Sequence, residues 1–538
     1  MSYSVREPTQ MSSKSFPDGN ARNQTEVFAV HGADPEVLAY AMAKYSRSAL
    51  SMRESLTEIS AQRAEQFLNT FYFQYGHRSI ADLAHIAFAV ERLSLLAAIV
   101  LVDEQRWDGQ ERSTRYQNFL KSGWYFPDFG EDAGSAKLYR ETVENLFAAY
   151  ERTTAAVLAA LEKRVARPEA LKPESYARTL KARAFDVARY LLPLATNTSL
   201  GQIVNARTLE TQVSRLLSHP AAEVRELGLK LREAATGPAW NVQAQAGAAL
   251  VEKLAGQPEL AAEAANLLTR EVKTAPTLVK YAEANPYLMQ TQAELTQAAK
   301  ELLGGLAIAE APLVDLVERT ESLEVELAAT LLYAVSHYPY RQIRDVVAGW
   351  PAARVNEVVE LGLKHRGRHD ELLRAFYAGA ALRFDILMDV GGFRDMHRHR
   401  RVTQILQGFT TAHGYETPET GDLGADVNLL AEAGALEDYK AAADAAHAAS
   451  VRIAAGSAPE AAQSALYVLP LATRVRCLFK MDFAEAQYIS ELRSAAAGHF
   501  SYRRVAWEMY RALERQHPTL ARHVRVTDFT KPIDLLQR

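Results

Sequence analysis

The densest group of reactive side chains in this sequence lies at 394–401, which reads Arg-Asp-Met-His-Arg-His-Arg-Arg. Four arginines and two histidines within eight residues repel one another, so an anion that neutralises part of this charge stabilises the segment. A guanidinium group matches the oxygens of a phosphate in a bidentate manner. The sequence therefore predicts an anion site that includes Arg398, His399 and Arg400, followed closely by Thr403.

Two other interpretations of this segment remain open. A basic helix face can be solvated and contact RNA through its charge. His397 and His399 could instead bind a metal ion. The neighbouring cations disfavour a divalent ion, and no carboxylate-rich partner segment stands out, so we expect no metal site.

Two further polar groups lie in the first half of the chain. Residues 110–116 read Gln-Glu-Arg-Ser-Thr-Arg-Tyr, in which the Ser113 hydroxyl and the Arg115 guanidinium could bind one phosphate. Arg207 and Arg215 are eight residues apart, about two helical turns, so both can face one cavity. A surface loop and a pair of exposed helix arginines are the simpler interpretations of these two groups.

The pentapeptide Leu-Pro-Leu-Ala-Thr occurs at 192–196 and again at 469–473. In both copies a tyrosine stands three residues before the proline, and an arginine follows 22 or 23 residues after it. Matched flanks indicate a tandem duplication. A strand followed by a helix is also predicted twice, over 26–31 and 35–48 and again over 313–317 and 322–336.

Length and composition limit the class of protein. A chain of 538 residues is too long for one hydrophobic core, and 48% hydrophobic with 23% charged residues is typical of a soluble globular protein. The net charge of -4 gives no overall attraction to nucleic acid or to a membrane. The sequence shows no secretory signal, and its longest apolar run, 93–102, is too short to cross a bilayer, so we expect a cytoplasmic protein.

The single cysteine, Cys477, excludes an intrachain disulfide, and its apolar neighbours indicate a packed, structural thiol. We expect an α+β fold that is mostly helix and contains two tandem domains. Residues 1–24 are predicted to form a disordered tail, 25–303 the first repeat with a helical connector, and 304–538 the second repeat.

These motifs together resemble the signature of the flavin-dependent thymidylate synthases. That signature runs Arg-His-Arg, two residues, Ser, and then four residues to a Ser-x-Arg-Tyr element. Downstream follow an Ala-Arg…Leu-Pro block, an Asn-x-Arg and a further arginine. The first half resembles this pattern over nearly its whole length, except that Asp-Glu-Gln stands at 103–105 where Arg-His-Arg is expected. Its matching residues are Ser79, Glu111, Ser113, Arg115, Tyr116, Arg189, Asn205, Arg207, Arg215 and His219.

The second half shows the opposite pattern. Arg-His-Arg is present at 398–400, with Thr403 in place of the serine and Arg493 as the later arginine. The Ser-x-Arg-Tyr element is missing, Asp-Phe-Ala at 482–484 replaces Asn-x-Arg, and Leu466 replaces the arginine before the proline. Each half keeps what the other has lost.

The resemblance implies a homotetrameric family whose active sites form between subunits. When two copies are fused, each active site at their junction needs every motif only once. Each repeat is therefore expected to lose motifs that the other repeat supplies, if the two repeats have specialised. On this interpretation Arg398, His399, Arg400 and Thr403 hold the flavin, assisted by Ser79, Asn205, Arg207 and His219. Glu111, Ser113, Arg115 and Arg189 bind the nucleotide, and Arg215 faces the uracil ring as the catalytic residue.

The implied reaction transfers a methylene group from methylene-tetrahydrofolate to dUMP, with reduced FAD supplying the hydride and NADPH reducing the flavin. An arginine beside the uracil carbonyls favours an electron-rich ring carbon and requires no cysteine nucleophile. A non-catalytic flavin- or nucleotide-binding relative is the alternative function, and RNA binding is a third. By analogy, two chains would associate as a homodimer that recreates four domains, with no nucleic-acid partner.

Overall fold

The computed structural model describes residues 32–44, 78–104, 106–286, 322–334, 340–364, 382–418 and 428–536, with shorter pieces between them. The predicted tail at 1–24 and the predicted domain boundary near residue 304 lie outside the described residues. The strand expected at 26–31 also lies largely outside them, and its described members Phe28 and Val30 are not in a strand. The domain boundaries therefore stay a prediction.

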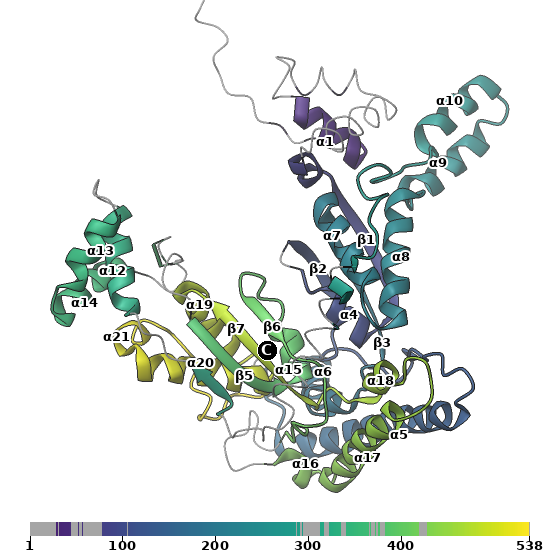
Figure 1. The fold of residues 1–538 in the computed structure, drawn as a ribbon. Helices are drawn as coiled ribbons and strands as arrows, with labels where there is room; N and C mark the ends of the chain where they lie inside the picture. Colours follow the sequence, from purple (N-terminus) through teal and green to yellow (C-terminus); the bar gives the residue numbers. More distant parts are fainter. Residues whose placement is uncertain are drawn as a thin grey trace, which may run out of the picture.

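The first repeat contains a three-stranded antiparallel sheet in the order β1-β3-β2 (Figure 1). Its strands are β1 (His85–Ser94), β2 (Trp107–Glu111) and β3 (Asn197–Asn205). Along β3, buried and more exposed residues alternate, as the period of two in a strand requires. Leu200 and Val204 face the core, whereas Ile203 on the opposite face is 50% exposed. One face of this sheet is therefore left open.

The second repeat contains a four-stranded antiparallel sheet in the order β4-β5-β7-β6. Its strands are β4 (Val314–Leu316), β5 (Leu382–Asp389), β6 (Thr403–Leu406) and β7 (Arg474–Met481). The order β5-β7-β6 repeats that of β1-β3-β2, with β4 added at the edge. Cys477 is fully buried in β7, and burial raises the pKa of its thiol, which agrees with the predicted structural role.

Corresponding helices follow corresponding strands, and each begins at a similar cap. Ser94 caps α4 (Leu95–Leu101) and Asp389 caps α15 (Val390–Met396). Asn205 caps α7 (Ala206–Leu217) and Asp482 caps α19 (Phe483–Ser494). Short polar side chains at these positions accept hydrogen bonds from backbone N–H groups that have no partner within the helix.

Longer helices surround the two sheets. Helix α5 (Ala133–Arg164) packs against both α6 (Pro173–Ala188) and α17 (Leu436–Ala454), and α17 belongs to the second repeat. Helices α9 (Val242–Lys253) and α10 (Pro258–Leu268) extend away from the first repeat (Figure 1). The remaining elements are α1 (Pro35–Lys44), η2 (Arg78–Leu83), η3 (Arg189–Leu191), α8 (Ala222–Thr236), α12 (Leu323–Ala334), α13 (Tyr340–Ala348), α14 (Ala352–Leu363), α16 (Leu429–Glu432), α18 (Ala461–Ser464), η6 (Ala465–Val468), α20 (Phe500–Gln516) and α21 (Pro518–Ala521). The fold is α+β and rich in helix, as predicted.

The two copies of the pentapeptide pair with each other at the centre of the molecule. Leu194 N–H donates to the Leu469 carbonyl over 2.9 Å, and Leu471 N–H donates to the Leu192 carbonyl over 2.9 Å. These two bonds exchange equivalent positions, which is the pattern of an isologous twofold interface. The bridge between Pro193 and Pro470 lies on this pseudo-twofold axis. The tandem repeat therefore folds as an internal dimer with one continuous hydrophobic core among the described residues, so the expectation that the chain is too long for a single core is wrong.

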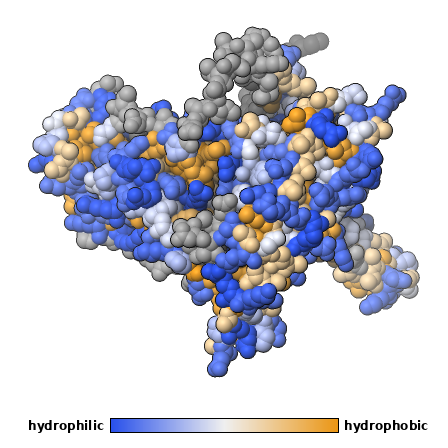
Figure 2. Space-filling model, turned by 90° about the horizontal axis from the view of Figure 1, so that it is seen from below, coloured by the Kyte–Doolittle hydropathy of each residue, from blue (hydrophilic) through white to orange (hydrophobic). Residues whose placement is uncertain are grey.

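Most of the surface seen from below is hydrophilic, with apolar patches scattered over it (Figure 2). Among the residues that the structure describes, no helix combines the length and the apolar character needed to cross a membrane.

Candidate functional site

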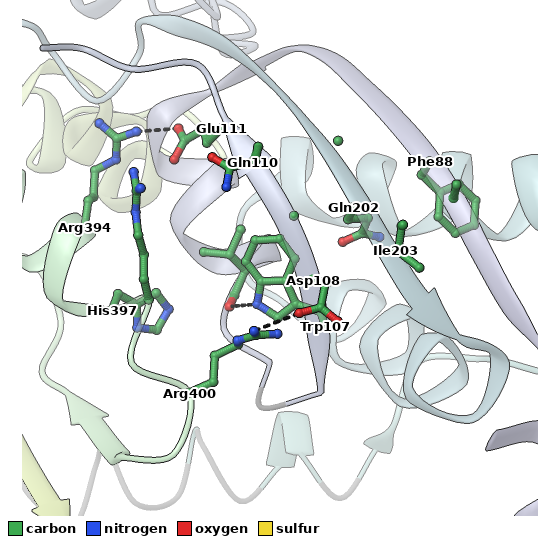
Figure 3. Close-up of a pocket in the computed structure, with 15 residues that line it drawn as sticks. Phe88, Trp107, Asp108, Gln110, Glu111, Gln202, Ile203, Arg394, His397 and Arg400 are labelled. Atoms are coloured by element: carbon green, nitrogen blue, oxygen red, sulfur yellow. Dashed lines mark hydrogen bonds and ion pairs between the residues drawn. The ribbon is translucent and has the colours of Figure 1, made fainter. Parts of the chain in front are cut away.

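A cavity of about 680 Å³ opens between the free face of the first sheet and the arginine-rich segment of the second repeat (Figure 3). We call this cavity the groove. Its size lies within the range of cofactor and small-molecule pockets. Its lining comes from β1, β2, β3 and the loop after α4 on one side, and from Arg394, His397, Arg398 and Arg400 on the other. Neither repeat could form this groove alone.

The first repeat supplies an apolar floor. Phe88, Trp107 and Ile203 line the groove, and the Trp107 indole N–H donates to the Val102 carbonyl over 2.9 Å. A Cβ atom at Gly109 would lie 2.0 Å from the Trp107 ring, so glycine at this position allows the indole to lie across β2. By the strand register, Phe88 and Trp107 stand with Val204 on the core side of the sheet. Ile203 stands on the open side, so apolar groups reach the groove from both sides of the sheet.

The second repeat supplies a cationic wall. Arg394 binds Glu111, and Arg400 Nη2 lies 2.8 Å from Asp108 Oδ1 (Figure 3). Arg394 Nε is buried without a hydrogen-bond partner in the described part of the chain. The Arg398 side chain is 51% exposed at the rim. A ligand with negatively charged oxygens could use these donors.

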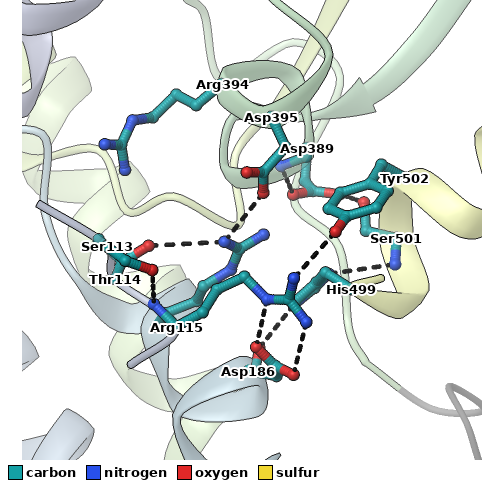
Figure 4. A network of polar contacts seen from close by, with 12 residues as sticks. Ser113, Thr114, Arg115, Asp186, Asp389, Arg394, Asp395, His499, Ser501 and Tyr502 are labelled. Carbon is teal, nitrogen blue, oxygen red and sulfur yellow. Dashed lines mark hydrogen bonds and ion pairs between the residues drawn. The ribbon is translucent and has the colours of Figure 1, made fainter. Parts of the chain in front are cut away.

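A second, buried group of arginines lies next to the groove (Figure 4). Arg115 binds both carboxylate oxygens of Asp186, at 2.8 and 3.2 Å. Its Nη1 donates to the Tyr502 hydroxyl over 2.9 Å, and its Nη2 donates to the Ala497 carbonyl over 3.2 Å. The Arg115 backbone N–H donates to Ser113 Oγ over 3.2 Å. The predicted phosphate arginine of the first repeat is thus held by residues of both repeats.

Arg189 is only 2% exposed and reaches Asp395 of the second repeat over 3.2 Å. Its Nε and Nη2 atoms are buried without a hydrogen-bond partner among the described residues. Burial alone would raise the pKa of Asp395, but Arg189, Arg398 and neighbouring cations lower it to about 2. Asp395 is therefore ionised near neutral pH, and Arg189 keeps spare donors for a further acceptor.

A third contact joins the Arg-His-Arg segment to α19. Arg493 Nε donates to His399 Nε2 over 2.7 Å, and His399 Nδ1 lies 3.3 Å from Glu485 Oε1. Burial lowers the pKa of His399, which is 5% exposed. His399 therefore faces α19, and it is absent from the groove lining.

The structure brings together many of the predicted residues, with contributions from both repeats. Arg398 and Arg400 line the groove, as does Glu111 of the first repeat. Arg398 Nη2 lies 3.7 Å from Asp395 Oδ1, which links the groove to the buried arginines. Thr403 is exposed at the start of β6, where it pairs with Lys480 and does not line the groove.

The described contacts do not bring Arg215 to the groove or to the buried arginines. Arg215 binds Glu104 at 2.9 and 3.2 Å, and it donates to the Val100 carbonyl over 2.8 Å. The charge-reversed segment at 103–105 therefore neutralises the arginine that was predicted to face the uracil ring.

Four other predicted flavin residues lie at helix ends of the first repeat. Asn205 caps α7, and Arg207 lies 3.0 Å from Asp82. His219 Nδ1 accepts a hydrogen bond from Ala221 N–H, and burial together with Arg215 and Arg225 lowers its pKa to about 4. Ser79 lies in η2, and its side chain is not among those described. The flavin roles of these residues stay predictions.

Sequence reasoning missed Asp395, Tyr502, Glu485 and Trp107. Asp395 stood inside the arginine-rich segment, so its charge was the one available signal. Tyr502 is 387 residues from Arg115, and no local pattern marks it as a partner. Among the described residues, no group of three or more histidine, cysteine or carboxylate side chains could hold a metal ion.

A groove with apolar lining and an arginine wall, joined to buried arginines at the junction of two repeats, has a chemistry suited to anionic ligands. The sequence model of the family described as thymidylate synthase complementing protein matches residues 28–237 and 321–519. The chain therefore belongs to this family and contains two tandem copies of its domain.

Relatives of two kinds are similar to this chain. A UPF0159 protein of Chlamydia pneumoniae is 27% identical over 545 residues, covering 95% of this chain and 93% of that protein. A UPF0159 protein of Thermoplasma acidophilum is 23% identical, covering 90% of this chain and 94% of that protein. A flavin-dependent thymidylate synthase of Clostridium tetani is 25% identical over 177 residues, covering 33% of this chain and 67% of that protein.

Proposed function

We propose that this chain is an FAD-dependent thymidylate synthase that methylates dUMP to dTMP, with methylene-tetrahydrofolate as carbon donor and NADPH as reductant. One observation carries the proposal: Arg115 and Arg189 of the first repeat converge on Tyr502 and Asp395 of the second. These contacts join the predicted nucleotide-binding residues of the first half to the arginine-rich segment and helix α20 of the second half.

The groove fits a flavin. Phe88, Trp107 and Ile203 offer apolar contacts, and Arg394, Arg398 and Arg400 offer donors for phosphate oxygens. When bound, a flavin supplies the redox chemistry of the reaction. The protein's own contribution is to orient the ring against the floor and to hold the diphosphate at the rim.

The buried arginines fit a nucleotide phosphate. Arg115, Arg189, Arg493 and the half-exposed Arg398 act on three carboxylates, Asp186, Asp395 and Asp389, so the cations exceed the carboxylates by one. A phosphate monoester carries about -1.5 to -2 charges at neutral pH. The unpartnered donors of Arg189 are suited to its oxygens.

We further propose that Arg493, in place of Arg215, faces the uracil ring. The Arg493 guanidinium lies 5.5 Å from the Tyr502 ring, and Tyr502 also contacts Arg115. A guanidinium beside the uracil carbonyls stabilises negative charge that develops on the ring as its carbon attacks. Arg215 is already paired with Glu104.

One composite site per chain follows from this assignment. The equivalent site on the other side of the pseudo-twofold axis would need an arginine where Leu466 stands. It would also need the Arg-His-Arg segment where the first repeat has Asp-Glu-Gln. A homodimer would then contain two working sites within four domains, and the mass of the protein in solution tests that assembly.

A non-catalytic flavin- or nucleotide-binding relative is the second candidate. It is favoured by the carboxylates that already occupy Arg115 and Arg189, because a compensated site needs no ligand for its stability. Two experiments separate the candidates. We expect the purified protein to carry bound flavin and the gene to rescue a thymidine-requiring bacterium. Bound flavin without rescue favours the binding relative. If the protein carries no flavin and the gene does not rescue growth, both proposals are contradicted.

A further inference from the structure

We propose that Glu485 and His399 form a positioning pair that holds Arg493 beside Tyr502 and the buried arginines without neutralising its charge. This inference rests on the proposed function, because it assigns a role at the same composite site.

The pair joins the two ends of one helix. Glu485 lies in the first turn of α19 and Arg493 in its last turn. His399 lies between them and contacts both, through Nδ1 at 3.3 Å from Glu485 Oε1 and through Nε2 at 2.7 Å from Arg493 Nε. His399 and Glu485 are 5% and 4% exposed, so water does not compete for these contacts.

The chemistry of the groups determines the tautomer of His399. A guanidinium can only donate hydrogen bonds, so His399 Nε2 must be an acceptor without a proton. The ring proton then resides on Nδ1, and this N–H donates a hydrogen bond to Glu485. Glu485 is itself fixed, because its backbone N–H donates to Asp482 Oδ1 over 2.8 Å and Arg401 lies 3.8 Å from its second oxygen.

Arg493 differs in charge compensation from the other arginines of the site. Arg115, Arg189, Arg394, Arg398 and Arg400 each have a carboxylate oxygen within 4.0 Å of a side-chain nitrogen. In the part of the chain that the structure describes, Arg493 has no such ion pair, and a neutral imidazole orients it instead. Its positive charge is therefore available to a ligand.

The first repeat contains the same arrangement with one decisive change. Glu104 and His399 each lie ten residues after the cap of the corresponding helix, α4 or α15. In the second repeat His399 orients Arg493, whereas in the first repeat Glu104 forms an ion pair with Arg215. Thr208 takes the place of Glu485 in the first repeat. The Thr208 N–H donates to the cap residue Asn205, just as the Glu485 N–H donates to the cap residue Asp482. A carboxylate in place of imidazole thus neutralises the arginine in the repeat whose site has degenerated.

The ligand group expected at Arg493 is an electron-rich carbonyl oxygen or an anion on the nucleotide base. Beside the buried arginines, a guanidinium that forms no ion pair favours negative charge on a ligand more than a paired one does. His399 and Glu485 act through Arg493 and do not contact the ligand.

The test measures dUMP binding by equilibrium dialysis for the wild-type protein and four variants, with the melting temperature of each. His399→Glu reproduces the first repeat, Glu485→Ala removes the acceptor for Nδ1–H, and Glu485→Gln keeps an acceptor oxygen. Glu491→Gln is the matched control, because it removes a carboxylate from the same helix that binds Arg366 outside the site.

We expect His399→Glu and Glu485→Ala to weaken dUMP binding by about tenfold to a hundredfold, the range for a hydrogen bond to a charged group. Glu485→Gln should lose less, and Glu491→Gln should bind as the wild type does. Equal affinity in all five proteins would overturn the proposal, as would a loss in Glu491→Gln equal to that in Glu485→Ala.

Nitrogen NMR of histidine-labelled protein provides a readout that does not depend on folding of the charged variants. With His399→Gln used to assign the signal, we expect a neutral ring with its proton on Nδ1, and a proton on Nε2 would overturn the proposal. If the wild type fails to bind dUMP, the proposed function is contradicted. The tautomer of His399 then decides the positioning of Arg493 by itself.

Discussion

Arg115 of the first repeat donates a hydrogen bond to the hydroxyl of Tyr502 of the second repeat over 2.9 Å. The same guanidinium binds Asp186 of its own repeat, so each repeat determines part of its orientation. Burial to 7% exposure makes this arrangement rigid. The parts of the molecule that we propose bind anions are therefore joined through the internal interface.

Because we assign flavin to the groove and the nucleotide phosphate to the buried arginines, substitutions at the two places should affect different ligands. Arg398→Ala and Arg400→Ala should lose bound flavin, whereas Arg115→Ala should retain flavin and weaken dUMP binding by about tenfold to a hundredfold. Flavin absorbance of the purified variants and dUMP dialysis measure both effects. Arg152→Ala, which removes an exposed ion pair with Asp438, serves as control. Equal flavin retention in the three site variants would show that the assignment is wrong.

Gly109→Ala should abolish or strongly weaken flavin binding. The added Cβ would lie 2.0 Å from the Trp107 ring and 2.5 Å from the Gly201 carbonyl oxygen, so the indole must leave the groove floor. Gly256→Ala is the matched control, since a Cβ there meets nothing within 4 Å. The measurement is the flavin content per chain, and similar flavin content in both variants would contradict the position given to the flavin ring.

Titration calorimetry should find one dUMP bound per chain. Leu466 and Glu104 occupy the positions that a second site needs for an arginine and a histidine. A stoichiometry of two nucleotides per chain would mean that the pseudo-symmetric site still binds.

Lowering the pH below 6.5 should destabilise the folded protein, in part through His499. This side chain is fully buried, donates from Nε2 to the Asp186 carbonyl over 2.8 Å and accepts from Ser501 N–H. Burial, followed by Arg189, lowers its pKa well below the usual value. The unfolded state therefore binds a proton that the folded state does not. The contribution of His499 to the free energy of unfolding is complete above the pKa that this histidine has in the unfolded state. It is lost as the pH falls below that pKa.

The loss from His499 should be about 1.4 kcal/mol for each pH unit below about 6.5. Urea unfolding at pH 7.5 and 5.5 measures it. Other buried histidines change stability in the same direction, so the test compares wild type with His499→Gln, whose stability should depend less steeply on pH. Identical pH dependence in the two proteins would exclude this role.

Leu194→Ala should lower the free energy of unfolding by about 2–5 kcal/mol, the usual cost of a cavity in a packed core. Leu194 is fully buried at the pseudo-twofold axis, whereas Leu267 on α10 is 70% exposed. Leu267→Ala is thus the control, and chemical denaturation measures both. If Leu194→Ala lowers the free energy of unfolding by less than Leu267→Ala does, the centre of the molecule is not tightly packed.

The duplication could be recognised from the sequence because the pentapeptide contacts its own copy. Each copy must offer the same backbone groups to the other, as the exchanged bonds of Leu194 and Leu471 show. The leucine side chains of both copies are also fully buried, so the two copies fill equivalent places in the core.

The role of Arg215 could not be judged from spacing. Its distance from Arg207 along the helix suggested a shared cavity, but the loop after α4 brings Glu104 to its guanidinium. The partner lies 111 residues away, and the choice between ligand and carboxylate depends on how α7 approaches that loop. For the same reason, Asp395 and Tyr502 became visible only in the folded chain.

By itself, the sequence determined the family, the α+β class with two tandem domains, and which half carries which charged motif. These properties are local, because they follow from periodicity, composition and short residue spacings. Only the tertiary structure decided which arginines meet, which of them are neutralised, and that the groove forms between the repeats. Ion pairing and burial depend on distances across the whole fold, and positions along the chain do not encode those distances.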